Sequence, residues 1–372
     1  MPLPLDEYPV HQVPLSMRYP ATSDRNFYDR CYLNAHDRSG DVFLVTGLGA
    51  YPNLGVIDAF ATLRRGDRQV TVRTSDALGE DRMAQTVGPY RVEIVDPLQS
   101  LRVVCDADDH GIGFDLTWQG SFPAIEEPPH VVRQGGRIIL DAMRFAQVGT
   151  WSGVLRVEGE ELAVTPDRWV GTRDRSWGIR PVGEGEPPGR AAAEPAEGYG
   201  FWWTYVPLRF DDFALIVIVQ EDGDGNRILN EARRVWPADS GRPSEQLGWP
   251  EIEIRYRSGT RHPESAVIHM AERSGKPVTV SVDTLGFVAL NCGPGYGGDP
   301  VWSHGQWRGR GWVEGVVHDM TDPAVLGRVP FGVVDHVGRA VCDGAEGWGM
   351  FEHATFGRHA PSGFDDFTSV AP

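Results

Sequence analysis

The sequence is nearly devoid of lysine. Lys276 is the only lysine among 35 basic residues, which stand against 52 aspartates and glutamates and leave a formal net charge of −17. A chain with this charge is repelled by nucleic-acid phosphates and anionic membranes, so we expect neither as the main partner. The chain also has no run of 18 apolar residues, so we predict no membrane-spanning helix.

Cysteine is scarce as well, and its spacing carries no motif. Four cysteines are widely scattered, and none forms the closely spaced pairs that bind zinc. The first residues are short of apolar side chains and carry early acids, unlike a secretory signal. We therefore expect reduced thiols in a cytoplasmic protein.

Patterns for metals, cofactors and nucleophilic serine are missing too. No histidine pair has the spacing of metal ligands beside a third candidate, and no G-x-S-x-G elbow occurs. Residues 291–298 are rich in glycine, but Pro294 and the lack of a following helix favour a connection between strands over a phosphate loop. Residues 222–226 lack the remaining ligands of a calcium loop and predict a hairpin turn. We expect no metal and no cofactor.

Turn formers and tryptophans are plentiful. The 45 glycines and 28 prolines are spread along the chain, and short strand-like segments recur every 8–12 residues. This pattern predicts an all-β fold of antiparallel sandwich or barrel type. Residues 130–148 fit a short helix or a strand, and we favour a strand. The other strands expected in the first half are 27–34, 41–49, 56–63, 69–74, 90–95, 101–106, 112–119 and the hairpin 151–164.

A polar, proline-bearing stretch at 237–250 separates two strand-rich halves. We expect one β-domain over residues 1–240 and a second over 247–372, the latter with strands at 251–257, 265–272, 278–284 and 287–290. Residues 183–198 are rich in glycine, proline, alanine and glutamate, and are expected to form an exposed loop.

Residues 169–180, with the sequence WVGTRDRSWGIR, combine tryptophans, arginines and an aspartate. Arg173 and Arg175 flank Asp174, and nearby positive charge favours an ionised carboxylate. Trp177 and Gly178 would add a bulky wall and a tight turn. Such a segment is part of a site or a salt-bridged strand end, and we favour the site.

Residues 200–220 predict an aromatic hairpin that turns at 211–212. In its first strand Trp202 and Trp203 face opposite ways, so at least one belongs to the core and the other can stack on a ligand. The second strand, 214–219, is almost entirely apolar, which is typical of a strand buried on both faces.

Three pieces together resemble carotenoid 1,2-hydratase (hydroxyneurosporene synthase) and the AttH-like lipocalin-type proteins. Asp174-Arg-Ser-Trp-Gly178 resembles their Asp-x-x-Trp-Gly signature. Residues 203–216 resemble the aromatic strand, acidic turn and apolar strand that follow it. Residues 309–315, GRGWVEG, resemble a Gly-x-Gly-Tyr-x-Glu segment of the second domain.

The resemblance implies two lipocalin-like β-domains with an apolar cavity in or between them. Relatives hydrate or cyclise isoprenoid olefins, similar folds host cyclisations that include Diels–Alder reactions, and others have no assigned activity. The hydratases carry histidine or asparagine beside the motif Asp. Here Arg173 and Arg175 flank Asp174, so we expect a low pKa and a poor proton donor.

Acid-catalysed hydration or cyclisation needs a protonated carboxyl group and π-faces that stabilise a cation. Glu314 shares a strand face with Trp312, and it is either such an acid or a glutamate paired with Arg308 or Arg310. Glu352 and His353 are adjacent, so they face opposite ways. The candidate catalytic residues are Asp174, Glu314, His304, Glu352 and His353, and the candidate substrate-binding residues are Arg173, Trp177, Trp203, Tyr205, Trp302 and Trp312.

We therefore expect a cofactor-independent lyase or isomerase that hydrates, dehydrates or cyclises an isoprenoid-, steroid- or polyketide-like molecule. Two alternatives remain: a non-catalytic protein that binds a hydrophobic ligand, and a cyclase that acts by shaping its substrate. In each case the partner is a hydrophobic small molecule, and the sequence does not indicate an oligomeric state.

Overall fold

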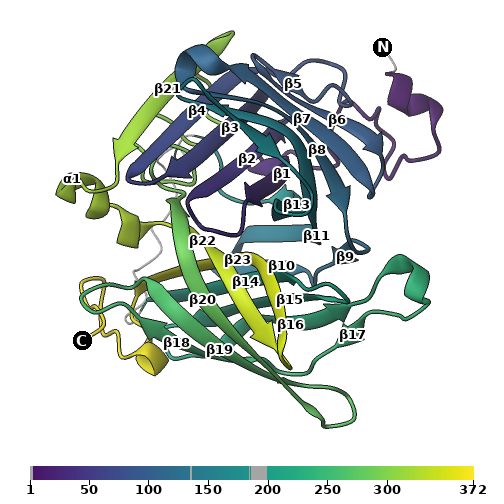
Figure 1. Cartoon of the computed structure of the whole chain (residues 1–372). Coiled ribbons are helices and arrows are strands. Elements are labelled where there is room, and N and C mark those ends of the chain that lie inside the picture. The colour runs from purple at the N-terminus through teal and green to yellow at the C-terminus, as the bar shows by residue number, and fades with distance from the viewer. Residues whose placement is uncertain (1–2, 135, 184, 186–198) are drawn as a thin grey trace.

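The computed structural model describes residues 3–134, 136–183, 185 and 199–372, which form two antiparallel sheets (Figure 1). The strands of the first sheet, in chain order, are β1 (Phe27–His36), β2 (Val42–Tyr51), β3 (Val56–Arg65), β4 (Arg68–Ala77), β5 (Thr86–Val87), β6 (Tyr90–Asp96), β7 (Ser100–Ala107), β8 (Ile112–Gly120), β9 (Ile125–Glu126), β10 (His130–Gln134), β11 (Arg137–Val157), β12 (Glu160–Val164), β13 (Val170–Ile179) and β21 (Trp312–Asp319).

The second sheet lies below the first in Figure 1. Its strands are β14 (Gly200–Arg209), β15 (Ala214–Asp222), β16 (Arg227–Val235), β17 (Glu245–Gln246), β18 (Glu251–Tyr256), β19 (Pro263–Ala271), β20 (Pro277–Ala289), β22 (Val334–Cys342) and β23 (Ala345–Gly357). Helical structure in the described residues is limited to α1 (Pro323–Leu326) and single 3-10 turns at Pro4–Glu7, Asp108–His110, Ala238–Ser240, Val329–Phe331 and Ala360–Ser362.

Each sheet curls around a hydrophobic core of its own. Leu33, Phe114 and Trp118 belong to the core inside the first sheet, whereas Val217 and Ile268 belong to the core inside the second. The expected all-β fold of two lipocalin-like halves is confirmed. Each half therefore has a packed core of its own.

A third core lies where the outer faces of the two sheets meet. Tyr32 and Phe43 contribute to it from the first sheet, and Trp203, Ile216 and Met350 from the second. Strands at this contact are buried on both faces, which explains the apolar run of β15. Leu215, Val217 and Val219 enter the inner core, while Ile216 and Ile218 enter the contact between the sheets.

Most local predictions are confirmed. Residues 130–148 form β10 and the first part of β11, and the β3–β4 hairpin turns at Gly66, whose φ of 55° is accessible to glycine. Residues 222–226 form the β15–β16 turn, where the Asp222 carboxylate accepts the Asn226 backbone N–H at 2.9 Å. Of the expected loop at 183–198, residues 184 and 186–198 lie outside the described residues.

The change of sheet does not coincide with the domain boundary expected at 240–247. The chain passes to the second sheet between β13 and β14, and residues 240–247 lie around β17, which pairs with β16 of the same sheet. The chain then returns, because β21 pairs with the edge strand β4 of the first sheet. Residues 290–319 therefore belong spatially to the first half.

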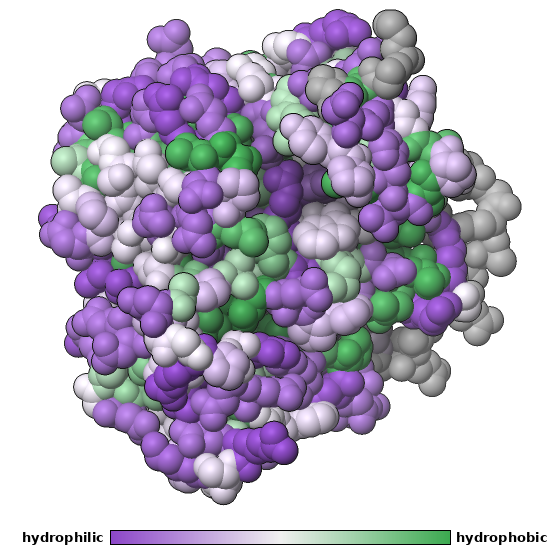
Figure 2. All heavy atoms as spheres, turned by 90° about the vertical axis from the view of Figure 1, so that its right-hand side faces the viewer, coloured by the Kyte–Doolittle hydropathy of each residue, from purple (hydrophilic) through white to green (hydrophobic). Residues whose placement is uncertain are grey.

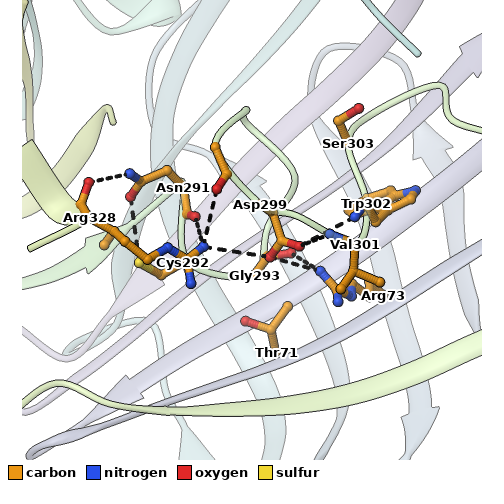
Figure 3. Close-up of polar contacts among 12 residues, drawn as sticks. Thr71, Arg73, Asn291, Cys292, Gly293, Asp299, Val301, Trp302, Ser303 and Arg328 are labelled. Atoms are coloured by element: carbon orange, nitrogen blue, oxygen red, sulfur yellow. Dashed lines mark hydrogen bonds and ion pairs between the residues drawn. The ribbon is translucent and has the colours of Figure 1, made fainter. Parts of the chain in front are cut away.

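A buried ion pair holds this returning segment in place (Figure 3). The Arg73 guanidinium on β4 lies 3.1 Å from the Asp299 carboxylate and 2.6 Å from that of Glu314. Asp299 also accepts the backbone N–H of Val301 at 2.9 Å. Gln69 of β4 donates to the backbone carbonyls of residues 289 and 292. Side chains of β4 thus fix the path of the connection after β20.

None of the helices in the described part of the chain has the length and apolar character needed to cross a membrane.

The two partners of Arg73 differ in burial, which yields a test. Arg73 and Asp299 expose 2% and 4% of their side chains, whereas Glu314 exposes 39%. We expect Arg73→Met to lower the free energy of unfolding by about 3–5 kcal/mol, because it leaves the buried Asp299 carboxylate with only Arg328, at 3.9 Å, as a cationic partner. Glu314→Gln is expected to cost less than about 1 kcal/mol. Urea unfolding of both variants measures the difference, and equal losses would contradict the assignment.

Candidate functional site

The contact between the two sheets encloses a cavity of about 200 Å³. The apolar part of its wall comes from both halves and includes Leu140, Phe201, Trp203, Leu229, Leu290 and Val333. On the face shown in Figure 2, hydrophobic residues gather across the middle of the molecule and the surface is hollowed just above them. A cavity with an apolar wall, as predicted, therefore lies between the two halves.

The polar side of the cavity is built on the paired strands β1 and β13. Tyr28, Arg30 and Tyr32 alternate along β1 toward the cavity, and Ser176 and Asp174 of β13 lie opposite Arg30 and Tyr32. Because successive side chains of a strand face opposite ways, Cys31 and Leu33 enter the inner core instead. The paired strands β1 and β13 thus place a row of polar groups against the apolar wall.

Asp174 corrects our prediction of a low pKa. The side chains of Arg173 and Arg175 face away from it: Arg173 donates to Gln147 at 2.8 Å, and Arg175 lies 3.1 Å from Asp29. Burial raises the pKa of Asp174 to about 7, although the Arg144 guanidinium opposes this rise. The arginines that are neighbours in sequence do not set its charge, so Asp174 keeps its proton close to neutral pH.

Trp203 forms the aromatic floor. Its ring stacks on Phe201 at 6.4 Å between centroids and on His130 at 5.9 Å. The indole N–H donates to the Glu352 carboxylate, which also lines the cavity. Burial lowers the pKa of His130 to about 4, so this imidazole is neutral at neutral pH.

Two neighbouring carboxyl groups lie at the wall, Glu352 lining the cavity and Asp335 behind it. Asp335 of β22 and Glu352 of β23 are directly opposite in register, and the Tyr32 hydroxyl donates to Asp335 at 2.5 Å. Burial, followed by the charge of Glu352, raises the pKa of Asp335 well above its ordinary range. The Asp335 carboxyl therefore favours its protonated form beside Glu352.

Arg144 supplies a fixed positive charge at the cavity wall. Its Nε donates to Glu127 at 2.6 Å, and its guanidinium carbon lies 4.8 Å from the centre of the Tyr205 ring. Burial raises the pKa of Glu127, opposed by Arg144. Since Glu127 and Arg144 both line the cavity, this ion pair forms part of its polar edge.

Asp174, Glu352 and Trp203 are the predicted site residues that the structure brings together in the cavity. Tyr205 shares the face of Trp203 and lies beneath Arg144. His353 faces the interior of the second half, where its Nδ1 lies 3.1 Å from the Thr204 hydroxyl. Glu352 and His353 thus face opposite ways, as expected.

The remaining predicted residues lie elsewhere. Glu314 pairs with Arg73 rather than with Arg308 or Arg310, so it does not enter the cavity. His304 lines an adjoining cavity of about 290 Å³, and burial lowers its pKa well below the ordinary value. Trp302 packs between His304 and Trp312. Arg173 and Trp177 lie on the face of β13 opposite Asp174.

Sequence reasoning missed Arg30, Tyr32, Glu127, Arg144 and Asp335. A signal exists for two of them. Along β1, Tyr28, Arg30, Tyr32 and Asn34 alternate with Cys31, Leu33 and Ala35, so an otherwise buried strand carries a polar face. No comparable pattern marks Glu127 or Arg144, whose placement depends on how the long strand β11 crosses the contact.

The sequence matches a family of unknown function, DUF8625, over residues 3–365. The chain belongs to this family. No match to a curated protein was found.

Several solved structures are similar to this DUF8625 member. A putative AttH from Nitrosomonas europaea has a TM-score of 0.53 at 12% identity, covering 93% of this chain and 98% of that one. CghA with Sch210972 has a TM-score of 0.50 at 11% identity, with 89% and 88% covered. Kievitone hydratase from Nectria haematococca has a TM-score of 0.49 at 14% identity, with 87% and 88% covered. The likeness to the putative AttH supports an AttH-like fold.

The raised pKa of Asp174 has a consequence for stability. Between pH 4 and 7 the folded state holds a proton that the unfolded chain has released, so the free energy of unfolding falls as pH rises through this window. We expect Asp174→Asn to be more stable than the parent at pH 8, by up to about 4 kcal/mol, with little difference near pH 4. Urea unfolding at both pH values provides the measurement.

Asp115→Asn is the matched control. The Arg102 side chain lowers the pKa of Asp115, so the parent carboxylate is stabilising above pH 4 and its loss is expected to destabilise the protein at pH 8. A shift of the same sign in both variants would contradict the placement of Asp174.

Proposed function

We propose that this chain is a cofactor-independent lyase or isomerase that hydrates, dehydrates or cyclises a hydrophobic small molecule in the cavity between its two sheets. The observation that carries the proposal is Asp174, a carboxyl group with a pKa near 7 beside an aromatic wall. An acid with this pKa can donate a proton at neutral pH and accept one in return. The substrate class we favour is isoprenoid-, steroid- or polyketide-like.

In the hydration direction, Asp174 donates its proton to one carbon of a double bond, and the positive charge develops on the other carbon. The π-face of Trp203 stabilises this charge. Water then adds to the cation, and its surplus proton passes to Asp174 or Glu352. Dehydration follows the same steps in reverse, and cyclisation replaces water by a second double bond, with proton loss to the same acids.

Tyr32 and the pair formed by Asp335 and Glu352 support this chemistry. Burial raises the pKa of Tyr32 well above its ordinary value, so the hydroxyl stays protonated and its donated hydrogen bond to Asp335 fixes its direction. Glu352 is held by the Trp203 indole N–H. The groups around Asp174 are thus oriented before a substrate arrives, which is how a binding site lowers the cost of reaching a transition state.

Turnover provides the direct test. A panel of terpenoid, steroid and polyketide olefins is incubated with the protein and the products are identified by mass spectrometry. For a substrate that turns over, we expect Asp174→Asn to reduce kcat by about 10²–10⁴-fold. The parent kcat/KM should fall as pH rises through about 7, because the acid form is lost. Asp115→Asn, which lies outside the cavity, is the control, and an undiminished rate in Asp174→Asn would refute the acid role.

A cyclase that acts by shaping its substrate is favoured by one observation, the continuous stack of Phe201, Trp203 and His130 along one wall. Such an enzyme needs no proton donor. We expect it to lose more activity in Trp203→Ala than in Asp174→Asn, whereas the acid mechanism predicts the reverse order. A protein that only binds its ligand would retain affinity and show no turnover in either variant.

A further inference from the structure

Arg30 is a buried cation without a counter-ion. It exposes 5% of its surface, lies in the middle of β1 and lines both the main cavity and the adjoining one. Within the described residues its guanidinium has no hydrogen-bonding or ion-pair partner, and its carbon lies 4.8 Å above the centre of the Tyr296 ring. Buried charges in proteins are almost always paired, so this arrangement calls for a ligand that completes it.

The two acids closest to Arg30, Asp58 and Asp174, do not neutralise its charge. Asp58 accepts the Gly305 backbone N–H at 2.6 Å and lies 3.2 Å from the Tyr51 hydroxyl. Burial raises the pKa of Asp58 to about 7, as it does for Asp174. Both carboxyls are therefore partly protonated at neutral pH, and neither forms an ion pair with Arg30 in the described part of the chain, so its guanidinium faces the cavity without a full counter-charge.

A second cation and two hydroxyls complete this corner. Arg180 follows β13, lines the same two cavities and has its guanidinium carbon 5.6 Å from the centre of the Tyr28 ring, with no acidic partner in the described part of the chain. Burial raises the pKa of Tyr296, so its phenol remains a donor. Ser176 lies opposite Arg30 in register. We call Arg30, Arg180, Ser176 and Tyr296 the donor corner.

We propose that the donor corner binds a negatively charged oxygen group, a carboxylate or the oxygen of an acidic enol, at one end of a hydrophobic substrate. Guanidinium groups suit this role because they stay charged and donate two parallel hydrogen bonds to such a group. This inference deepens the proposed function, since it assigns an amphiphilic anion as the substrate of the same cavity.

The pairing of β1 with β13 also separates the two ends of that substrate. Arg30 and Tyr32 are two residues apart on one strand face, and Asp174 lies opposite Tyr32. Two residues of a strand span about 7 Å along the backbone, so the reacting bond at Asp174 and the anionic group at Arg30 occupy different positions along the cavity. A neutral hydrocarbon of the same size would leave the donor corner unsatisfied.

Binding of 2-naphthoate and of its neutral methyl ester tests the inference without any turnover. The ligands are titrated into the full-length protein and followed by isothermal calorimetry. We expect the parent to bind 2-naphthoate at least tenfold more tightly than the ester. Arg30→Met should weaken naphthoate binding by about 10–100-fold, which corresponds to the loss of a charge-assisted hydrogen bond, and change ester binding less than about threefold.

Two further variants keep the test decisive. Arg180→Gln changes a partly exposed residue, so it gives the same readout if Arg30→Met fails to fold, and about a tenfold loss of naphthoate affinity is expected. Arg175→Met is the matched control, because Arg175 lies on the opposite face of β13 and pairs with Asp29. Equal affinity for the two probes, no naphthoate binding at millimolar concentration, or a preference that survives both Arg30→Met and Arg180→Gln would overturn the inference.

Asp174→Asn separates this inference from the proposed function. It removes the acid and leaves the donor corner intact, so the preference for naphthoate should persist. A preference for naphthoate in both the parent and Asp174→Asn, together with no turnover of any olefin by the parent, would uphold the anion site and refute the enzyme. Turnover of neutral olefins that is unaffected by Arg30→Met would uphold the enzyme and refute the anion site.

Discussion

The structure depends on the packing of two curled sheets against each other through their outer faces. Each sheet already encloses a core, so the strands at the contact, such as β1 and β15, are buried on both sides. Polar groups on these strands cannot reach solvent and must be satisfied between the sheets. The cavity forms where the two faces do not touch. Polar side chains that would not fit into a close-packed contact can therefore line it.

The same constraint governs the charges. Within the contact, burial raises the pKa of Asp174, Glu127 and Asp335, while Arg144 and Arg30 oppose it for Asp174. In water these acids would all be ionised at neutral pH. Desolvation keeps some of them protonated, and the interleaved arginines prevent the protons from being held too tightly. An acid that gives and regains a proton near neutrality results from this balance.

Much of the fold was accessible from the sequence, because strand alternation and turn residues are local signals. The hairpins, the two faces of the strand with Trp202 and Trp203, and the opposed directions of Glu352 and His353 all follow from a period of two. The pKa of Asp174 was predicted with the wrong sign, since its sequence neighbours were treated as spatial neighbours. Alternation itself places Arg173 and Arg175 on the other face, and applying it there would have corrected the prediction.

Other features depend on pairing between distant segments, which a single sequence does not reveal. Glu314 shares a strand face with Trp312, and its environment is decided by Arg73, which lies 241 positions away. The pairing of β21 with the first sheet likewise cannot be predicted from the sequence around β21. Arg30, by contrast, was visible as part of a polar stripe on a buried strand, a pattern that signals an interface between two layers.

The return of β21 also bears on how the chain folds during synthesis. β4 remains an unpaired sheet edge until the ribosome has made the segment around Glu314, and by then all of β14 to β20 has emerged. An open edge is a template for pairing with other chains. The nascent first half is thus exposed to intermolecular association for most of translation, and its folding is completed only after much of the second half has been made.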